Sequence, residues 1–195
     1  MQELYFGHTV EEAISNAIAI YRQKHIDSLE VKGWSEKQFV YHFYFGKGRN
    51  VTLQQVGLLN HVRQEANRLA INRSDGFKYQ ILQKIKSTGS GRVYEWFDNS
   101  YLFGNVRWVF GDGTLKGKYH GRCQQIDSNH IQYTGVISVQ YYDKFVDPFD
   151  LIEKLYGHSE SSLAPDWLKQ ATNIGGTPYS LSGHWQENFS GVLNI

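Results

Sequence analysis

The sequence predicts an α+β domain in which a curved antiparallel sheet or half-barrel is packed by helices at its N-terminal side. Up to about residue 86, apolar residues recur mainly at helical spacing. Beyond the polar, glycine-containing turn at residues 87–91, the pattern changes to that of strands joined by short turns, which favours an antiparallel meander. The aromatic content of 15 % is typical of a strand-rich core.

Composition sets limits on the class of protein. With 195 residues and 41 % hydrophobic content, the chain is long enough for one substantial core. Twenty basic and nineteen acidic residues give a net charge of +1, so the chain as a whole has no bias toward nucleic acid or anionic membranes, although a local basic patch is compatible with it. Cys123 is the single cysteine, which excludes an intrachain disulfide and a thiolate metal cluster. We expect a buried thiol there rather than a nucleophile.

The N-terminal half is expected to contain three helices and one strand. An amphipathic helix is predicted over residues 10–29, capped by Thr9. The aromatic run at residues 38–48 alternates like a strand and stops at two glycines. Thr52, with Gln55 at the capping-box position, is expected to start a helix, and a further helix follows over residues 74–86. We therefore divide the chain into an N-terminal helix or linker, residues 1–36, and a domain, residues 37–195.

The C-terminal half is expected to be mostly β. Strands are predicted over residues 92–97, 105–110, 114–126 and 130–142, with turns at 98–99, 111–113 and 127–129. A helix over residues 148–156 and a polar loop then precede a last strand over 179–193. The first residues lack the pattern of a secretory signal peptide, and no apolar run approaches membrane-spanning length, so we expect any export to use other machinery.

Three acids close the β-patterned segment at residues 133–150, and this is where we expect chemistry. Asp143, Asp147 and Asp150 follow an aromatic-rich strand, and strand ends are common places for functional sites. Asp147 before Pro148 also fits an ordinary helix start, with the aspartate as N-cap, and Asp150 fits the helix dipole. Both interpretations remain open.

Four groups of segments occur in an order that resembles a known family. They are residues 42–48 with 51–53 and 56–58, residues 101–106 with 113–115, residues 133–137 leading to 143–145, and residues 178–181 followed by 183–184. In order and spacing they resemble the activity domain of colicin M and related lipid II-degrading bacteriocins. The resemblance covers about residues 38–193 and implies a colicin M-like fold.

The acidic motif departs from the family pattern of Asp-x-Tyr-Asp followed after five residues by His-Arg. Asp143 matches the first acid, Phe145 stands at the tyrosine position, and Asp147 matches the second acid if Val146 is an insertion. No His-Arg pair follows, and the nearest downstream histidine is His158. The resemblance thus implies Asp143, Asp147 and His158 as catalytic residues, although His158 also fits a solvated loop position.

Hydrolysis of a polyprenyl phosphoester requires charge neutralisation, carboxylates and a proton donor. Asp143 and Asp147 could hold a divalent cation, Mg²⁺ or Ca²⁺, while His158 acts as acid or base. Lys47, Arg49 and Phe145 are expected to contact the substrate. The implied substrate is the lipid-linked peptidoglycan precursor lipid II in the periplasm of a target cell.

The implied partners are a cognate immunity protein and a larger delivery protein, since a toxin of this kind is secreted or delivered by dedicated machinery. We expect no nucleic-acid partner, although aromatic strands carrying Arg92, Arg107, Lys116 and Lys118 are compatible with one. The altered acidic motif leaves two other functions open: a binding or regulatory module without hydrolysis, and a different hydrolase on the same fold.

Overall fold

A computed structural model describes residues 33–103, 106, 110, 112–146 and 176–195. The helices of this part are α2 (Glu36–Phe45), α3 (Leu59–Asn72) and α4 (Phe77–Thr88), and the strands are β1 (Val51–Thr52), β2 (Gly91–Leu102), β3 (Asp112–Asp127), β4 (His130–Phe145) and β5 (Tyr179–Asn194). The predicted helices over residues 10–29 and 148–156 lie outside the described residues, as do Asp147, Asp150 and His158. The predicted boundary near residue 36 therefore stays a prediction.

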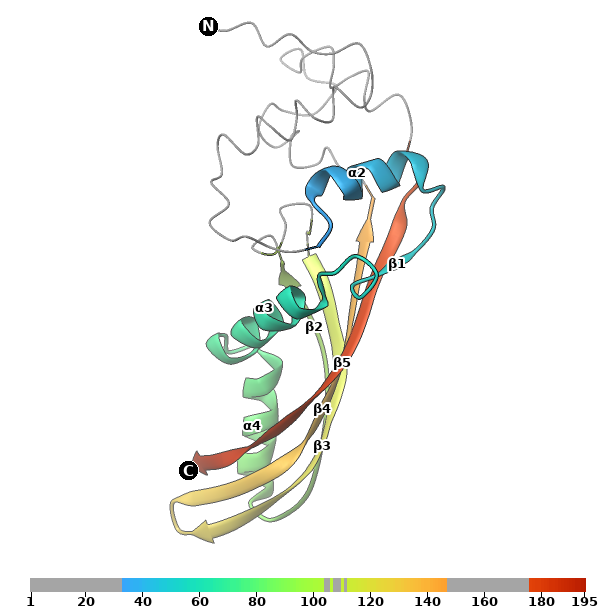
Figure 1. Cartoon of the computed structure of the whole chain (residues 1–195). Helices are drawn as coiled ribbons and strands as arrows, with labels where there is room; N and C mark the ends of the chain where they lie inside the picture. The colour runs from blue at the N-terminus through green and yellow to red at the C-terminus, as the bar shows by residue number, and fades with distance from the viewer. Residues whose placement is uncertain (1–32, 104–105, 107–109, 111, 147–175) are drawn as a thin grey trace, which may run out of the picture.

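One mixed sheet in the order β1-β5-β4-β3-β2 organises the domain. Strands β2 to β5 pair consecutively and antiparallel, as predicted, and the short β1 pairs parallel with β5. The sheet is curved and not closed, with α3 and α4 on its concave side and α2 across one end (Figure 1). The predicted α+β class with a curved sheet is therefore confirmed. No helix of the described part is long and apolar enough to cross a membrane.

Two details of the predicted sheet were wrong. Strand β2 continues through Asp98 and Asn99, where a turn was predicted, because both residues pair in register with β3 and Asp98 forms an ion pair with Lys116 at 3.0 Å. The predicted strand over residues 105–110 is absent at its two described positions, since Val106 lies in a turn and Phe110 is a buried loop residue. The connection from β2 to β3 is therefore longer than a hairpin turn.

The aromatic run at residues 38–48 was predicted as a strand, but residues 38–45 belong to helix α2 and residues 46–48 to the turn that follows it. Aromatic and apolar residues occupy both alternate faces of residues 39–45, so strand alternation could not be distinguished from helical spacing. The backbone N–H of Ser35 donates to Gln38 Oε1 at 2.8 Å, a capping-box bond at the helix start. Phe39 and Phe43, one turn apart, are buried on the sheet side, whereas Tyr41 remains exposed. Tertiary packing of one helical face thus decides the structure.

Helix α3 begins later than predicted. Thr52 and Gln55 exchange the two expected capping-box bonds, Thr52 N–H to Gln55 Oε1 at 2.8 Å and Gln55 N–H to Thr52 Oγ1 at 3.2 Å. These bonds close a turn rather than starting the helix, because Gly57 adopts a left-handed φ of 74° that interrupts it. Helix α4 corresponds to the helix predicted over residues 74–86, with both ends shifted.

The concave face of the sheet is apolar, and α4 packs on it. Phe77 of α4 stacks on Phe97 of β2 with ring centroids 4.5 Å apart. Cys123 is buried, and its Sγ lies 4.0 Å from the carbonyl oxygen of Ile85, which confirms the buried thiol. Gly121 and Gly135 face each other across β3 and β4, and any Cβ there would collide with the ring of Tyr119. These glycines let that ring lie flat on the sheet.

A buried charge cluster fixes both long helices to β5. Lys78 Nζ of α4 lies 2.5 Å from Glu187 Oε1, while Arg63 and Asn67 of α3 approach Glu187 Oε2 at 3.7 and 3.0 Å. The Lys78 and Glu187 side chains are only 10 % and 7 % exposed. The charged groups of the cluster are desolvated and are stabilised by one another. Removing one of them leaves a buried charge with fewer partners, which lowers the free energy of unfolding.

We expect Lys78→Met to lower the free energy of unfolding by about 2 kcal/mol, because Arg63 and Asn67 are then the remaining partners of Glu187 among the described residues. The double variant Lys78→Met/Glu187→Leu should recover most of this loss, since no unpaired charge stays buried. Urea denaturation measures both values. Lys116→Met, which removes the exposed pair with Asp98, is the control and should change stability by less than about 1 kcal/mol. Equal losses in the single and double variants would contradict the pairing.

Candidate functional site

Asp143 lies near the end of β4, on the concave face of the sheet. Tyr141, Asp143 and Phe145 alternate onto this face, whereas Tyr142 and Lys144 point to the other side and are exposed. Tyr141 and Phe145 are buried, and Asp143 between them is half-buried. A carboxylate thus occupies a position that the strand pattern otherwise reserves for core aromatic rings.

Two hydrogen bonds orient the Asp143 carboxylate. The Tyr141 hydroxyl donates to Oδ2 at 3.2 Å, and the backbone N–H of Lys144 donates to Oδ1 at 2.7 Å. Among the described residues, no Lys, Arg or His forms an ion pair with it. Burial raises the pKa of Asp143, the bonds from Lys144 and Tyr141 oppose that shift, and the charge of Asp112 adds to it. The Asp143 carboxyl group therefore takes up a proton more readily than an exposed aspartate.

The same environment affects the neighbouring tyrosines. Burial raises the pKa of Tyr141 and of Tyr179, and the nearby Asp143 charge adds to both shifts. Both phenols are therefore neutral hydrogen-bond donors at physiological pH. Tyr141 donates to Asp143, and Tyr179 donates to the carbonyl oxygen of Phe39 in α2 at 3.1 Å.

Phe145 belongs to an aromatic cluster that joins β4, β5 and α2. Its ring stacks on Tyr179 with a centroid distance of 5.1 Å and an interplanar angle of 18°, and it lies 5.8 Å from the ring of Phe43. The side chain is 8 % exposed. His42 of α2 meets the Tyr179 ring edge-on at 4.6 Å. The structure therefore gives Phe145 a packing role beside the Asp143 carboxylate.

Lys47 and Arg49 lie on the loop between α2 and β1, and both are exposed. Two backbone contacts fix this loop: Arg49 O is 2.7 Å from His42 Nε2, and Asn50 Oδ1 accepts the N–H of Ser180 at 2.9 Å. Ser180 pairs in register with Lys144, the neighbour of Asp143. Both cations thus belong to the end of the sheet that carries Asp143.

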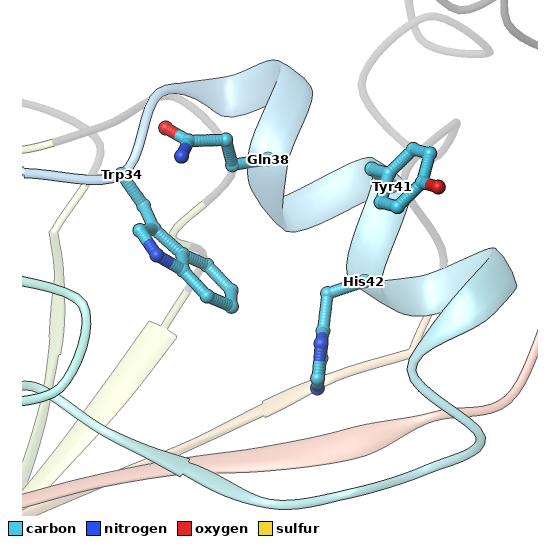
Figure 2. A pocket seen from close by; sticks show the side chains of 4 residues that line it. All are labelled: Trp34, Gln38, Tyr41 and His42. Atoms are coloured by element: carbon cyan, nitrogen blue, oxygen red, sulfur yellow. The ribbon is translucent and has the colours of Figure 1, made fainter.

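A pocket of about 300 Å³ opens at the same end, beside α2. Trp34, Gln38, Tyr41 and His42 line it, and the Trp34 and His42 rings both extend toward the strands (Figure 2). Their centroids are 5.4 Å apart. Its volume is at the lower end of the range for small-ligand pockets, and its lining is mainly aromatic.

A divalent cation would need further ligands beyond Asp143. No group of three His, Cys, Asp or Glu side chains converges within the described part of the chain. The charge of Asp112 contributes to the raised pKa of Asp143, but no contact within the described part places the two carboxylates at a shared ligand position, so Asp143 is the one ligand candidate among the described residues. Asp147 and His158, the other predicted ligand and acid–base residue, lie outside the described residues, so their roles stay predictions.

Sequence reasoning missed the residues that surround Asp143 and the neighbouring aromatic cluster. Tyr141 could have been found, because it lies two residues before the acid and strand alternation puts both on one face. Tyr179 and His42 come from elements that are distant in the sequence. Because residues 38–48 were predicted as a strand, the packing of helix α2 against this end of the sheet could not be predicted.

Solved structures similar to this chain include syringacin M and pectocin M2. The bacteriocin syringacin M from Pseudomonas syringae pv. tomato DC3000 aligns at 19 % identity with a TM-score of 0.41, and a mutant of that protein aligns at 17 % identity with a TM-score of 0.47. Pectocin M2 aligns at 18 % identity with a TM-score of 0.39. The chain resembles colicin M-like bacteriocins. This agrees with the resemblance predicted from the sequence motifs.

The alignments cover 81 % of this chain and 52 % of both syringacin M structures, and 92 % of this chain and 63 % of pectocin M2. The chain thus spans about half to two thirds of the length of these bacteriocins. No protein-family model and no curated protein matches the sequence. At such low identity the likeness concerns the fold, and the roles of single residues depend on the geometry of this chain.

Proposed function

We propose that this chain is an antibacterial toxin domain that hydrolyses lipid II, the polyprenyl-pyrophosphate-linked peptidoglycan precursor, in the periplasm of a target cell. Asp143 is the essential carboxylate in this proposal, Asp147 the second acid and His158 the acid–base residue. Lys47 and Arg49 neutralise the pyrophosphate. Phe145 lies beside the substrate site and positions Asp143 through the aromatic cluster.

The observation that carries the proposal is the half-buried carboxyl group of Asp143, whose pKa burial raises and which forms no ion pair within the described part of the chain. An acid that is half-buried and has no cationic partner among the described residues lowers stability, and perturbed acids of this kind are concentrated at functional sites. Two hydrogen bonds hold the carboxyl group at the end of a strand, with exposed cations on the adjacent loop. This arrangement suits a phosphorylated substrate, whose charge the cations and a metal ion would neutralise.

The aromatic pocket beside α2 supports a substrate that is partly apolar. It is connected to the Asp143 region by the contact between the rings of His42 and Tyr179. An amphiphilic substrate needs an apolar surface next to a polar reaction centre, and this end of the domain provides both. If a Mg²⁺ or Ca²⁺ ion is bound, Asp143 supplies one oxygen ligand, and the cation would stabilise charge on the phosphate oxygens.

Expression in two compartments of a susceptible bacterium tests the proposal. We expect growth arrest when the chain is exported to the periplasm and normal growth when it stays in the cytoplasm, because the pyrophosphate head of the substrate is processed outside the inner membrane. Asp143→Ala should abolish the arrest, while Asp98→Ala, an exposed acid on β2, should leave it intact. Killing by Asp143→Ala at equal protein level would refute the assignment of Asp143.

A second candidate is a binding or regulatory module that keeps the fold without hydrolysis. Phe145 favours this second candidate, because phenylalanine has no hydroxyl group at the position where the family that the chain resembles has tyrosine. The ring of Phe145 is also buried. Such a module would bind lipid II without cleaving it. Its affinity would then survive Asp143→Asn, which keeps the shape of the side chain.

A further inference from the structure

The convex face of the sheet, opposite α3 and α4, carries a second group of polar and aromatic side chains. Strands β2 and β3 present them as cross-strand pairs in successive rows. The rows are Arg92 with Arg122, Tyr94 with His120, Trp96 with Lys118, and Asp98 with Lys116. All eight side chains are exposed. The face is thus more basic than the chain as a whole, whose net charge is +1.

Three of these rows are internally paired. The Tyr94 and His120 rings stack at 4.6 Å, Lys118 Nζ lies 5.3 Å from the centroid of the Trp96 ring, and Lys116 binds Asp98 at 3.0 Å. The Arg92–Arg122 row differs, because two like charges stand directly opposite each other. Neither guanidinium has an ion pair or hydrogen bond to any other described residue. Like charges in this position destabilise a sheet.

A pocket of about 540 Å³ lies at this row. Gln124, Gln132 and Thr134 line it together with the two arginines. Amide and hydroxyl groups can donate hydrogen bonds to the same anion that the guanidinium groups attract. No Asp or Glu is among the described residues that line the pocket. Asp98 is paired with Lys116, and Asp127, at the β3–β4 turn, is paired with His130 at 2.7 Å.

We propose that the Arg92–Arg122 pocket is a binding site for a phosphate dianion, either a phosphomonoester group or free phosphate. Two guanidinium groups carry a charge of +2, which a phosphate of about −1.5 to −2 matches and a single carboxylate does not. Planar guanidinium groups also match phosphate oxygens geometrically. Binding removes the repulsion between the arginines, which accounts for an opposed pair that the fold itself does not need.

This site is separate from the Asp143 site. Thr134 precedes Asp143 by nine positions on β4, which corresponds to about 30 Å along a strand. An odd separation also puts the two side chains on opposite faces. The proposal therefore does not depend on lipid II hydrolysis, and either one can fail while the other stands.

Titration calorimetry of the full chain in low-salt buffer with inorganic phosphate tests the proposal, together with flotation on vesicles. Vesicles with phosphatidic acid present a phosphomonoester, and vesicles with phosphatidylglycerol present a monoanionic phosphodiester. We expect saturable binding of phosphate, of phosphatidic acid vesicles or of both, at least tenfold weaker in Arg92→Gln/Arg122→Gln. Lys84→Gln/Lys86→Gln on α4 removes the same charge elsewhere and should change the affinity by less than twofold.

The two probes separate a soluble ligand from a lipid headgroup, and binding of either supports the site. An unchanged melting temperature in the arginine variant, or a slightly higher one, excludes unfolding as the cause of the loss. If the arginine and lysine variants lost affinity equally, net charge alone would explain the binding, and the proposal would be overturned. Absence of binding to both probes, or preference for a single-stranded oligonucleotide over phosphate, would also overturn it.

Discussion

Asp143→Asn is expected to lower the rate of lipid II hydrolysis at least a hundredfold and at the same time to stabilise the fold. The asparagine keeps the size of the side chain, and its amide can still bond to Tyr141 and Lys144. It removes the charge whose burial raises the pKa of Asp143. We expect the free energy of unfolding at pH 7 to rise by on the order of 1 kcal/mol.

The pH dependence of stability distinguishes this mechanism from a general effect of the substitution. When the pKa of an acid is higher in the folded chain than in the unfolded chain, the folded chain binds more protons at intermediate pH. The contribution of this acid to stability therefore falls as pH rises. The fall begins near the ordinary value of 3.8 and ends above the raised folded pKa of Asp143. Urea denaturation of wild type and Asp143→Asn should therefore give curves that converge at low pH and diverge as pH rises.

An exposed acid provides the matched control for this prediction. Asp98→Asn on β2 removes the same charge from a side chain that is 62 % exposed, and its pair with Lys116 is a surface ion pair. It should leave hydrolysis unchanged and alter stability by less than about 1 kcal/mol. If Asp143→Asn gained stability without losing activity, the Asp143 carboxylate would have no role in hydrolysis.

Phe145→Ala is expected to lower the free energy of unfolding by about 3 to 4 kcal/mol. The ring is 8 % exposed and stacks between Tyr179 and the phenylalanines of α2, so its removal leaves a cavity where β4, β5 and α2 meet. Urea denaturation monitored by circular dichroism measures the change. Because Asp143 is two residues away on the same face, we also expect reduced hydrolysis.

Two variants show whether packing explains this effect. Phe145→Leu keeps most of the volume and should cost less than half as much as alanine. Tyr142→Ala, on the opposite face and 48 % exposed, should cost about 1 kcal/mol or less. If Phe145→Ala lost activity while keeping full stability, the ring would contact the substrate rather than support the site.

The sheet was the most predictable part of the fold from sequence. Strands β3, β4 and β5 were found because turn residues bound them and because alternation persists along each of them. Asp98 and Asn99 look like a turn but continue β2, since pairing with β3 outweighs their local preference. Helix α2 was mistaken for a strand because its aromatic residues occupy both faces, and only the packing of Phe39 and Phe43 against the sheet resolves the choice.

The candidate site was predictable in part. The end of the aromatic strand directed attention to Asp143, and the structure places this acid on the concave face between two buried rings. Its bond from Tyr141 follows from strand alternation, but the approach of His42 and Tyr179 depends on tertiary packing of distant segments. The position of Arg92 directly opposite Arg122 follows from the strand register, which cannot be deduced from composition and net charge.

The most direct test of the proposed function is incubation of the purified chain with lipid II and a divalent cation, alongside Asp143→Ala. The products are separated to detect released polyprenol and pyrophosphorylated muropeptide. We expect cleavage by the wild-type chain and none by the variant. Absence of cleavage with Mg²⁺ and with Ca²⁺, by a chain that is folded, would contradict the proposed hydrolysis.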